Sequence, residues 1–81
     1  MKGKSMKTIT TKPPLAVRKR IAALGVSAEH YRKRILDELA FYAKLEHKRP
    51  DQDEYYWIAF KLGFDHPRES VPVVRWAKGE A

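Results

Sequence analysis

The chain has 81 residues and carries 17 Lys or Arg against 10 Asp or Glu, which gives a net charge of +7. A chain of this length forms one domain with a modest core, which leaves little room for an enclosed active site. It contains no cysteine, which excludes disulfides and thiolate metal sites and fits a reducing cytoplasm. The longest apolar run, residues 55–60, is far shorter than a membrane span. We therefore expect a cytoplasmic protein that does not enter a membrane.

The positive charge is concentrated in the first 34 residues. This segment contains ten Lys or Arg and one acid, a net charge of +9, whereas residues 35–81 contain seven bases and nine acids, a net charge of −2. A basic segment followed by a mildly acidic one steers a polyanion toward one end of a molecule. This segregation favours nucleic acid as the partner without indicating which one, so RNA stays a possibility beside DNA. The alternative is a protein whose basic charge serves solubility alone.

The hydrophobic pattern predicts an all-α fold with three helices, at about residues 13–24, 28–47 and 52–62. Pro13 suits the first turn of a helix, where the missing N–H costs nothing. Ser27 and Asp51 are expected to cap the second and third helices. Gly25 and Gly63 are expected to end the first and third, because glycine adopts the left-handed conformation most easily.

Each predicted helix carries an apolar stripe that should face the core. In chain order the stripes are Val17, Ile21 and Leu24; Tyr31, Ile35, Leu39 and Tyr42; and Tyr55, Ile58, Ala59 and Leu62. Residues 1–12 are expected to form a flexible basic arm or a short strand. Residues 64–81 contain two prolines and are predicted to be an extended tail that Trp76 holds against the body.

The junction between the first two predicted helices has the layout of a helix-turn-helix. A short helix, a glycine turn at Gly25, a cap at Ser27 and a cation-bearing second helix would let that second helix enter the major groove. The alternative is an ordinary helical hairpin with a solvated basic face. The candidate nucleic-acid-binding residues are Lys2, Lys4, Lys7, Lys12, Arg18, Lys19, Arg20, His30, Arg32, Lys33 and Arg34.

Residues 1–45 also resemble the ribbon-helix-helix repressors, the family of the Arc and methionine repressors. The resemblance rests on the basic arm, the Thr-rich segment 7–12, Pro13, the first apolar stripe, Gly25, and Ser27 capping a helix with Tyr31 and Ile35 inside. It implies that residues 7–12 form a strand that pairs with the same strand of a second copy. The resulting two-stranded ribbon of a homodimer would enter the major groove. A monomeric three-helix domain is the other possibility.

The third predicted helix carries more aromatic residues than one face of a short helix can bury. Tyr56, Trp57 and Phe60 are therefore candidate anchors for a protein partner or a second copy of the chain. The alternative is that the first helix and the Trp76 segment cover these rings. Nucleic acid is disfavoured here by four nearby acids, Asp51, Asp53, Glu54 and Asp65.

The sequence offers no pattern typical of catalysis or of metal binding. His47 and His66 stand near acids but without a known ligand spacing, and there is no nucleophile elbow or phosphate-cradling glycine loop. We expect no catalytic residue, no metal and no cofactor. The leading hypothesis is a small DNA-binding regulatory protein. The alternative is a protein–protein interaction module, an adaptor or inhibitor that docks through the aromatic third helix.

Overall fold

The computed structural model describes residues 12–80. All regular secondary structure in this part of the chain is helical, with no strand, which confirms the all-α prediction. In order, it contains α1 (Leu15–Leu24), α2 (Ala28–Ala43), α3 (Glu54–Leu62), the 3₁₀ helix η2 (Pro67–Ser70) and α4 (Val71–Ala77). Over the described range, every helix is too short or too polar to cross a bilayer.

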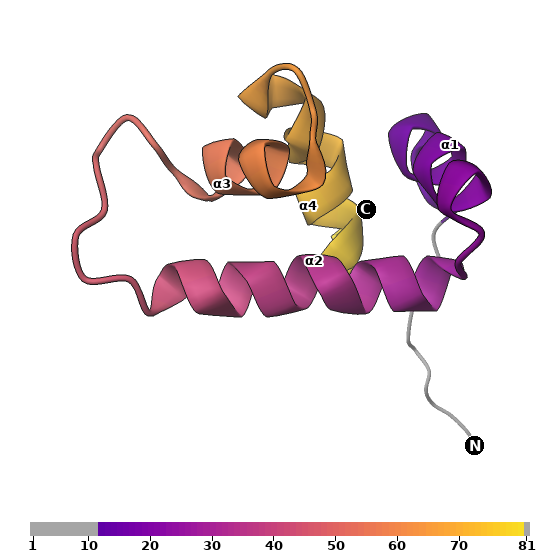
Figure 1. Cartoon of the computed structure of the whole chain (residues 1–81), viewed down its shortest axis with the longest axis horizontal. Helices are drawn as coiled ribbons and strands as arrows, with labels where there is room; N and C mark the ends of the chain where they lie inside the picture. The colour runs from indigo at the N-terminus through magenta and orange to yellow at the C-terminus, as the bar shows by residue number, and fades with distance from the viewer. Residues whose placement is uncertain (1–11, 81) are drawn as a thin grey trace.

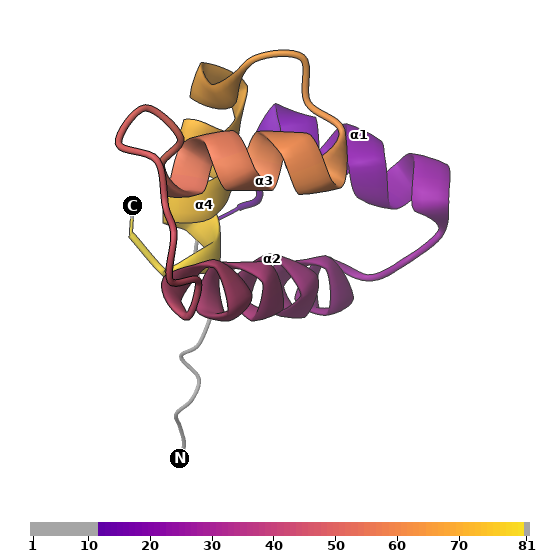
Figure 2. The ribbon, with the colours of Figure 1, turned by 60° about the vertical axis from the view of Figure 1, so that its left-hand side comes forward.

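The long helix α2 forms the base of the molecule, and the other helices lie on one side of it (Figures 1 and 2). α1 stands beside the N-terminal end of α2, and α3 runs back above α2 in the opposite direction. α4 descends onto α2 and packs against both α2 and α3. The opposite face of α2 is therefore uncovered by the other helices.

Several helix ends follow local signals that the sequence predicts. The backbone N–H of Gly25, at a φ of 72°, donates to the carbonyl of Ile21 and ends α1. The hydroxyl of Ser27 accepts a hydrogen bond of 3.0 Å from the backbone N–H of His30 and caps α2. Gly63, at a φ of 81°, ends α3.

Other boundaries differ from the prediction. α1 begins at Leu15 because Pro14 is extended, with a ψ of 162°, as the residue before the first turn. α2 ends at Ala43 and not at residue 47, and the carbonyl oxygen of Ala43, which this leaves without an intrahelical partner, accepts a hydrogen bond of 3.1 Å from the ammonium of Lys48. Asp53, and not Asp51, caps α3.

The largest difference lies in residues 64–81, for which the prediction of an extended tail is wrong. Pro67 and Pro72 occupy the first turns of η2 and α4, where they start helices and do not interrupt them. The buried hydroxyl of Ser70 lies 2.7 Å from the carbonyl oxygen of Tyr55, which joins this segment to α3. Trp76 is 3% exposed and holds the segment against the body, as predicted, but as part of a fourth helix.

The core is assembled from all four α-helices. α1 contributes Val17, whereas Leu24, predicted to face inward, is 62% exposed. The apolar stripes of α2 and α3 contribute most of their predicted members. The buried cluster consists of Val17, Tyr31, Ile35, Ile58, Leu62, Val73, Val74, Trp76 and Ala77.

Candidate nucleic-acid interface

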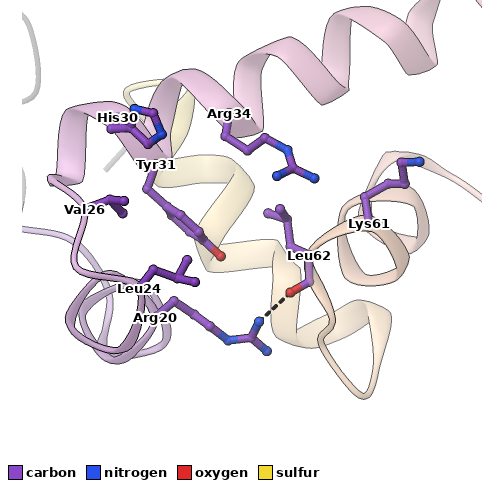
Figure 3. Close-up of a pocket in the computed structure, with 8 residues that line it drawn as sticks. All are labelled: Arg20, Leu24, Val26, His30, Tyr31, Arg34, Lys61 and Leu62. Carbon is purple, nitrogen blue, oxygen red and sulfur yellow. Dashed lines mark hydrogen bonds between the residues drawn. The ribbon is translucent and has the colours of Figure 1, made fainter.

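A hollow of about 360 Å³ opens between the end of α1, the first half of α2 and the end of α3 (Figure 3). We call it the basic cleft, after the four basic side chains that line it, Arg20, His30, Arg34 and Lys61. The rest of its lining is Leu24, Val26, Tyr31 and Leu62, so none of the described residues around it is acidic. Such a concentration of one sign of charge attracts anions.

Arg20 forms the wall of the basic cleft and also holds α1 against α3. Its guanidinium donates hydrogen bonds to the carbonyl oxygens of Leu62 and Gly63, the latter at 2.7 Å. It also lies over the ring of Phe64, 4.4 Å from the centroid. The carbonyls at the end of a helix lack intrahelical partners and carry partial negative charge, which explains this attachment. Arg20 is therefore a structural contact as well as a source of positive charge.

Arg34 and Lys33 are exposed on α2 and each pair with an acid one turn further on. Arg34 Nε lies 3.1 Å from the carboxylate of Glu38, and Lys33 Nζ lies 3.0 Å from that of Asp37. Pairs of this kind at a surface contribute only about 0.3–0.5 kcal/mol. In Figure 3 the guanidinium of Arg34 points across the cleft toward Leu62. A phosphate can therefore compete for Lys33 at little energetic cost, whereas the partner of Arg34, Glu38, is only 16% exposed and holds that guanidinium more firmly.

Arg32 is turned away from this surface. Its Nε donates a hydrogen bond of 2.8 Å to the carbonyl oxygen of Ala77, at the end of α4. The side chain is half-buried and serves the packing of α4 on α2. The sequence predicts Arg32 as a nucleic-acid contact, and the structure places it in the fold instead.

The remaining predicted contacts divide into two groups. Lys12, Arg18 and Lys19 are exposed before and along α1, a helix without acidic residues. Lys19 also lines a hollow of about 310 Å³ that shares Arg20 with the basic cleft. The predicted contacts Lys2, Lys4 and Lys7 lie outside the described residues.

Tyr31 places an unusual polar group beside the basic cleft. The side chain is 4% exposed, and its hydroxyl has no hydrogen-bond partner among the described residues. Burial raises the pKa of Tyr31, while the positive charges of Arg20 and Arg34 act in the opposite direction. In Figure 3 the ring points from α2 toward Leu62. A buried hydroxyl without a partner destabilises a fold by about 1–3 kcal/mol.

Lys61 is the cleft residue that the sequence does not single out. It lies in the last turn of α3, among the aromatic residues predicted to form a separate surface. The attachment of Arg20 to Leu62 and Gly63 is what brings this turn beside α1. The only local signal is that a cation is favoured at a helix C-terminus.

The predicted partner-binding aromatics are unequally exposed. Phe60 is 68% exposed and Tyr56 36%, whereas Trp57 is partly covered. Trp57 stacks on Phe41 of α2 with ring centroids 5.6 Å apart. Its Nε1 donates a hydrogen bond of 3.3 Å to Glu38. Phe60 and Tyr56 are therefore exposed at the surface, as predicted, whereas Trp57 is partly covered by Phe41 of α2.

The histidines and acids of residues 12–80 form no group of three or more that could hold a metal ion. Comparisons of the chain with protein-family models, with curated proteins and with solved structures gave no match. The resemblance to ribbon-helix-helix repressors therefore remains a prediction. The strand that this resemblance implies spans residues 7–12, and only Lys12 of it belongs to the described residues.

Proposed function

We propose that this protein binds duplex DNA through the basic cleft and the exposed cations of α1 and α2. The observation that carries the proposal is the basic cleft itself, which Arg20, Arg34 and Lys61 line and no described acid does. Glu38, the partner of Arg34, lies with Asp37 and Lys61 on a neighbouring hollow. Phosphate contacts supply most of the affinity of a protein for DNA, and Lys and Arg make them.

The arrangement of α1 and α2 also suits this function. A three-residue turn, Gly25 to Ser27, joins the two helices, and the outer face of α2 is free along its length. His30 and Lys33 are exposed on α2. In a helix-turn-helix, residues in the first turns of the second helix reach the bases while the first helix contacts the backbone.

The proposed contact surface is narrower than the one predicted from sequence. Arg20 and Arg32 are held by carbonyl oxygens at the ends of α3 and α4. The proposed contacts are Lys12, Arg18, Lys19, His30, Lys33, Arg34 and Lys61, and Lys2, Lys4 and Lys7 stay in the proposal as a basic arm. We propose a regulatory role, in which the protein acts by binding to DNA and catalyses no reaction.

A titration of labelled duplex DNA at several salt concentrations tests this function. We expect affinity to fall linearly on a log–log plot as salt rises, and the slope to shrink by about 0.9 for each phosphate contact removed. The double variant Arg34→Gln, Lys61→Gln should therefore bind more weakly and with a shallower slope. Arg75→Gln is the matched control, because Arg75 is exposed on α4 and does not line the basic cleft.

The proposal is wrong if the protein fails to bind duplex DNA at low salt, or if binding does not weaken as salt rises. It is also wrong in its choice of surface if Arg75→Gln weakens binding as much as the double variant does.

A protein–protein interaction module, acting as an adaptor or inhibitor, is the second candidate function. The exposed rings of Phe60 and Tyr56 favour it, because aromatic side chains at a surface are frequent anchors at interfaces. Replacing Tyr56, Trp57 and Phe60 separates the two functions. Loss of partner binding with unchanged DNA affinity and an intact fold would support the interaction module.

A further inference from the structure

A second hollow, of about 280 Å³, lies between the outer face of α3 and the loop that joins α2 to α3. Its floor and walls include four aromatic rings, and cationic side chains stand at its rim. We call it the aromatic groove and define it by Tyr42, Tyr56, Trp57, Phe60, Lys48 and Arg49. We propose that the aromatic groove binds single-stranded nucleic acid, with a base stacked on Phe60 and the backbone phosphates beside Lys48 and Arg49.

The charge of the groove is opposite to what the sequence of this region suggests. None of the four nearby acids lines it. Glu54 pairs with Lys78 at 2.9 Å, and Asp53 accepts the backbone N–H of Tyr56 at 3.0 Å as the cap of α3. Asp51 is exposed and lies 3.5 Å from Arg49. Glu54 and Asp53 are thus engaged elsewhere, whereas Asp51 stands beside a cation of the groove, so a phosphate at Arg49 has to displace an exposed ion pair.

Two of the four rings, Trp57 and Tyr42, are held in place by contacts within the protein. Trp57 is fixed by its stack on Phe41 and by its hydrogen bond to Glu38. The hydroxyl of Tyr42 donates to the carbonyl oxygen of Gln52 at 2.8 Å, which fixes the loop against α2. A groove that is already formed loses little conformational entropy when it binds a ligand.

Cations lie close to two of the rings, one from the groove lining and one, Lys61, from the neighbouring basic cleft. Lys48 Nζ lies 5.3 Å from the ring centroid of Tyr42, and Lys61 Nζ lies 5.1 Å from that of Trp57. Single-strand binding combines these two elements, since bases stack on aromatic faces while cations follow the phosphates. Every base has such a face, so this recognition does not require a particular sequence.

The same features favour nucleic acid over a protein partner. The centre of a protein interface is depleted of charged residues, whereas Lys48 and Arg49 line this groove together with its rings, and Lys61 Nζ lies 6.0 Å from the ring centroid of Phe60. The exposed aliphatic residues Leu15 and Leu24, which would suit a protein surface, lie on α1 instead. This inference goes beyond duplex binding at the basic cleft and does not depend on it.

The test is a titration of labelled oligothymidylate, about 12 nucleotides long, followed by fluorescence anisotropy. Phe60→Ala should weaken binding by about tenfold, the effect of losing one stacked base. Leu15→Ala is the matched control, because it also truncates an apolar side chain more than half exposed and lines neither the aromatic groove nor the basic cleft, so oligothymidylate binding should be unchanged. Substituting both Lys48 and Arg49 with Gln should make the salt dependence shallower.

Two comparisons separate this inference from duplex binding. Phe60→Ala should leave the affinity for duplex DNA unchanged, and Arg34→Gln should weaken duplex binding while it leaves oligothymidylate binding unchanged. Inorganic polyphosphate, which has the charge without the bases, should compete poorly for the aromatic groove.

Three results would overturn the inference. The first is equal affinity of Phe60→Ala and the unaltered protein for oligothymidylate. The second is competition by polyphosphate as strong as that by unlabelled oligothymidylate. The third is tighter binding of a peptide of alternating Glu and Phe, which would assign the groove to an acidic protein partner.

Discussion

Arg32 Nε donates a hydrogen bond of 2.8 Å to the carbonyl oxygen of Ala77, 45 positions further along the chain. Ala77 is the last residue of α4, so its carbonyl belongs to the group that a helix leaves without intrahelical partners. The guanidinium charge also meets the negative end of the helix dipole. One side chain thus satisfies the end of α4 and joins that helix to α2.

We expect Arg32→Met, which keeps most of the apolar stem, to lower the free energy of unfolding by about 1.5–3 kcal/mol, the range for a hydrogen bond from a charged group. Urea unfolding followed by circular dichroism measures this change. Lys33→Met is the matched control, since its ion pair with Asp37 is exposed and should contribute less than about 0.5 kcal/mol. Equal shifts in the two variants would contradict a structural role for Arg32.

The buried hydroxyl of Tyr31 leads to a prediction of the opposite sign. Tyr31→Phe removes a polar group that has no described partner and leaves the ring in the core. We expect the free energy of unfolding to rise by about 1 kcal/mol, because the desolvation of that hydroxyl no longer opposes folding. A clear loss of stability in thermal or urea unfolding would mean that the hydroxyl is satisfied by a group other than the described residues.

We expect the protein to lose stability at alkaline pH because of two side chains, Tyr31 and Lys78. Burial raises the pKa of Tyr31 above its usual 10.0, so folding favours the neutral phenol, and this contribution is fully present below pH 10 and lost as the pH rises further. The hydrogen bond that the ammonium of Lys78 donates to Glu54 raises the pKa of Lys78 above 10.5, so its contribution is likewise lost above that pH. Unfolding measured across this range should show a shallower decline in Tyr31→Phe and in Lys78→Met. A decline identical to that of the unaltered protein would contradict both assignments.

The fourth helix is expected to be essential to the fold. Trp76→Ala should lower the free energy of unfolding by about 3–5 kcal/mol, because it leaves a cavity where a 3%-exposed side chain packs. Phe60→Ala is the matched control, since it removes an aromatic ring that is 68% exposed. Urea unfolding distinguishes the two, and a small effect of Trp76→Ala would mean that residues 71–77 are peripheral.

The parts of the fold that sequence predicts are those fixed by local chemistry. The hydroxyl of Ser27 and the left-handed conformation of Gly25 act within a few residues, so the helix ends they set are readable in advance. Pro72 is ambiguous, because proline both begins and interrupts helices. Its role depends on whether Val73 and Trp76 find a buried surface, and that surface is built by residues far away in the chain.

The candidate site illustrates the same division. No feature of the sequence distinguishes Arg18 from Arg20, yet Arg18 is exposed and Arg20 is bound to carbonyl oxygens at the end of α3. The partners of Arg20 and Arg32 lie 42 to 45 positions away, beyond the reach of any local pattern. The charge of the region is therefore predictable, but which cations remain free, and the addition of Lys61, depend on how the helices pack.

The slight anchorage of α1 has a consequence for binding. This helix buries one side chain completely, Val17, packs Ala16 and Ile21 partly against the core, and is attached to α3 through Arg20. An element with so few buried groups opens at a lower free energy than the whole domain unfolds. Lys12, Arg18 and Lys19 move with it, while Arg34 and Lys61 stay on the main body. Gly25 would then act as a hinge. A polyanion that contacts both α1 and the main body would shift the equilibrium toward the closed position of α1. The measured affinity would therefore include the free energy of that closure.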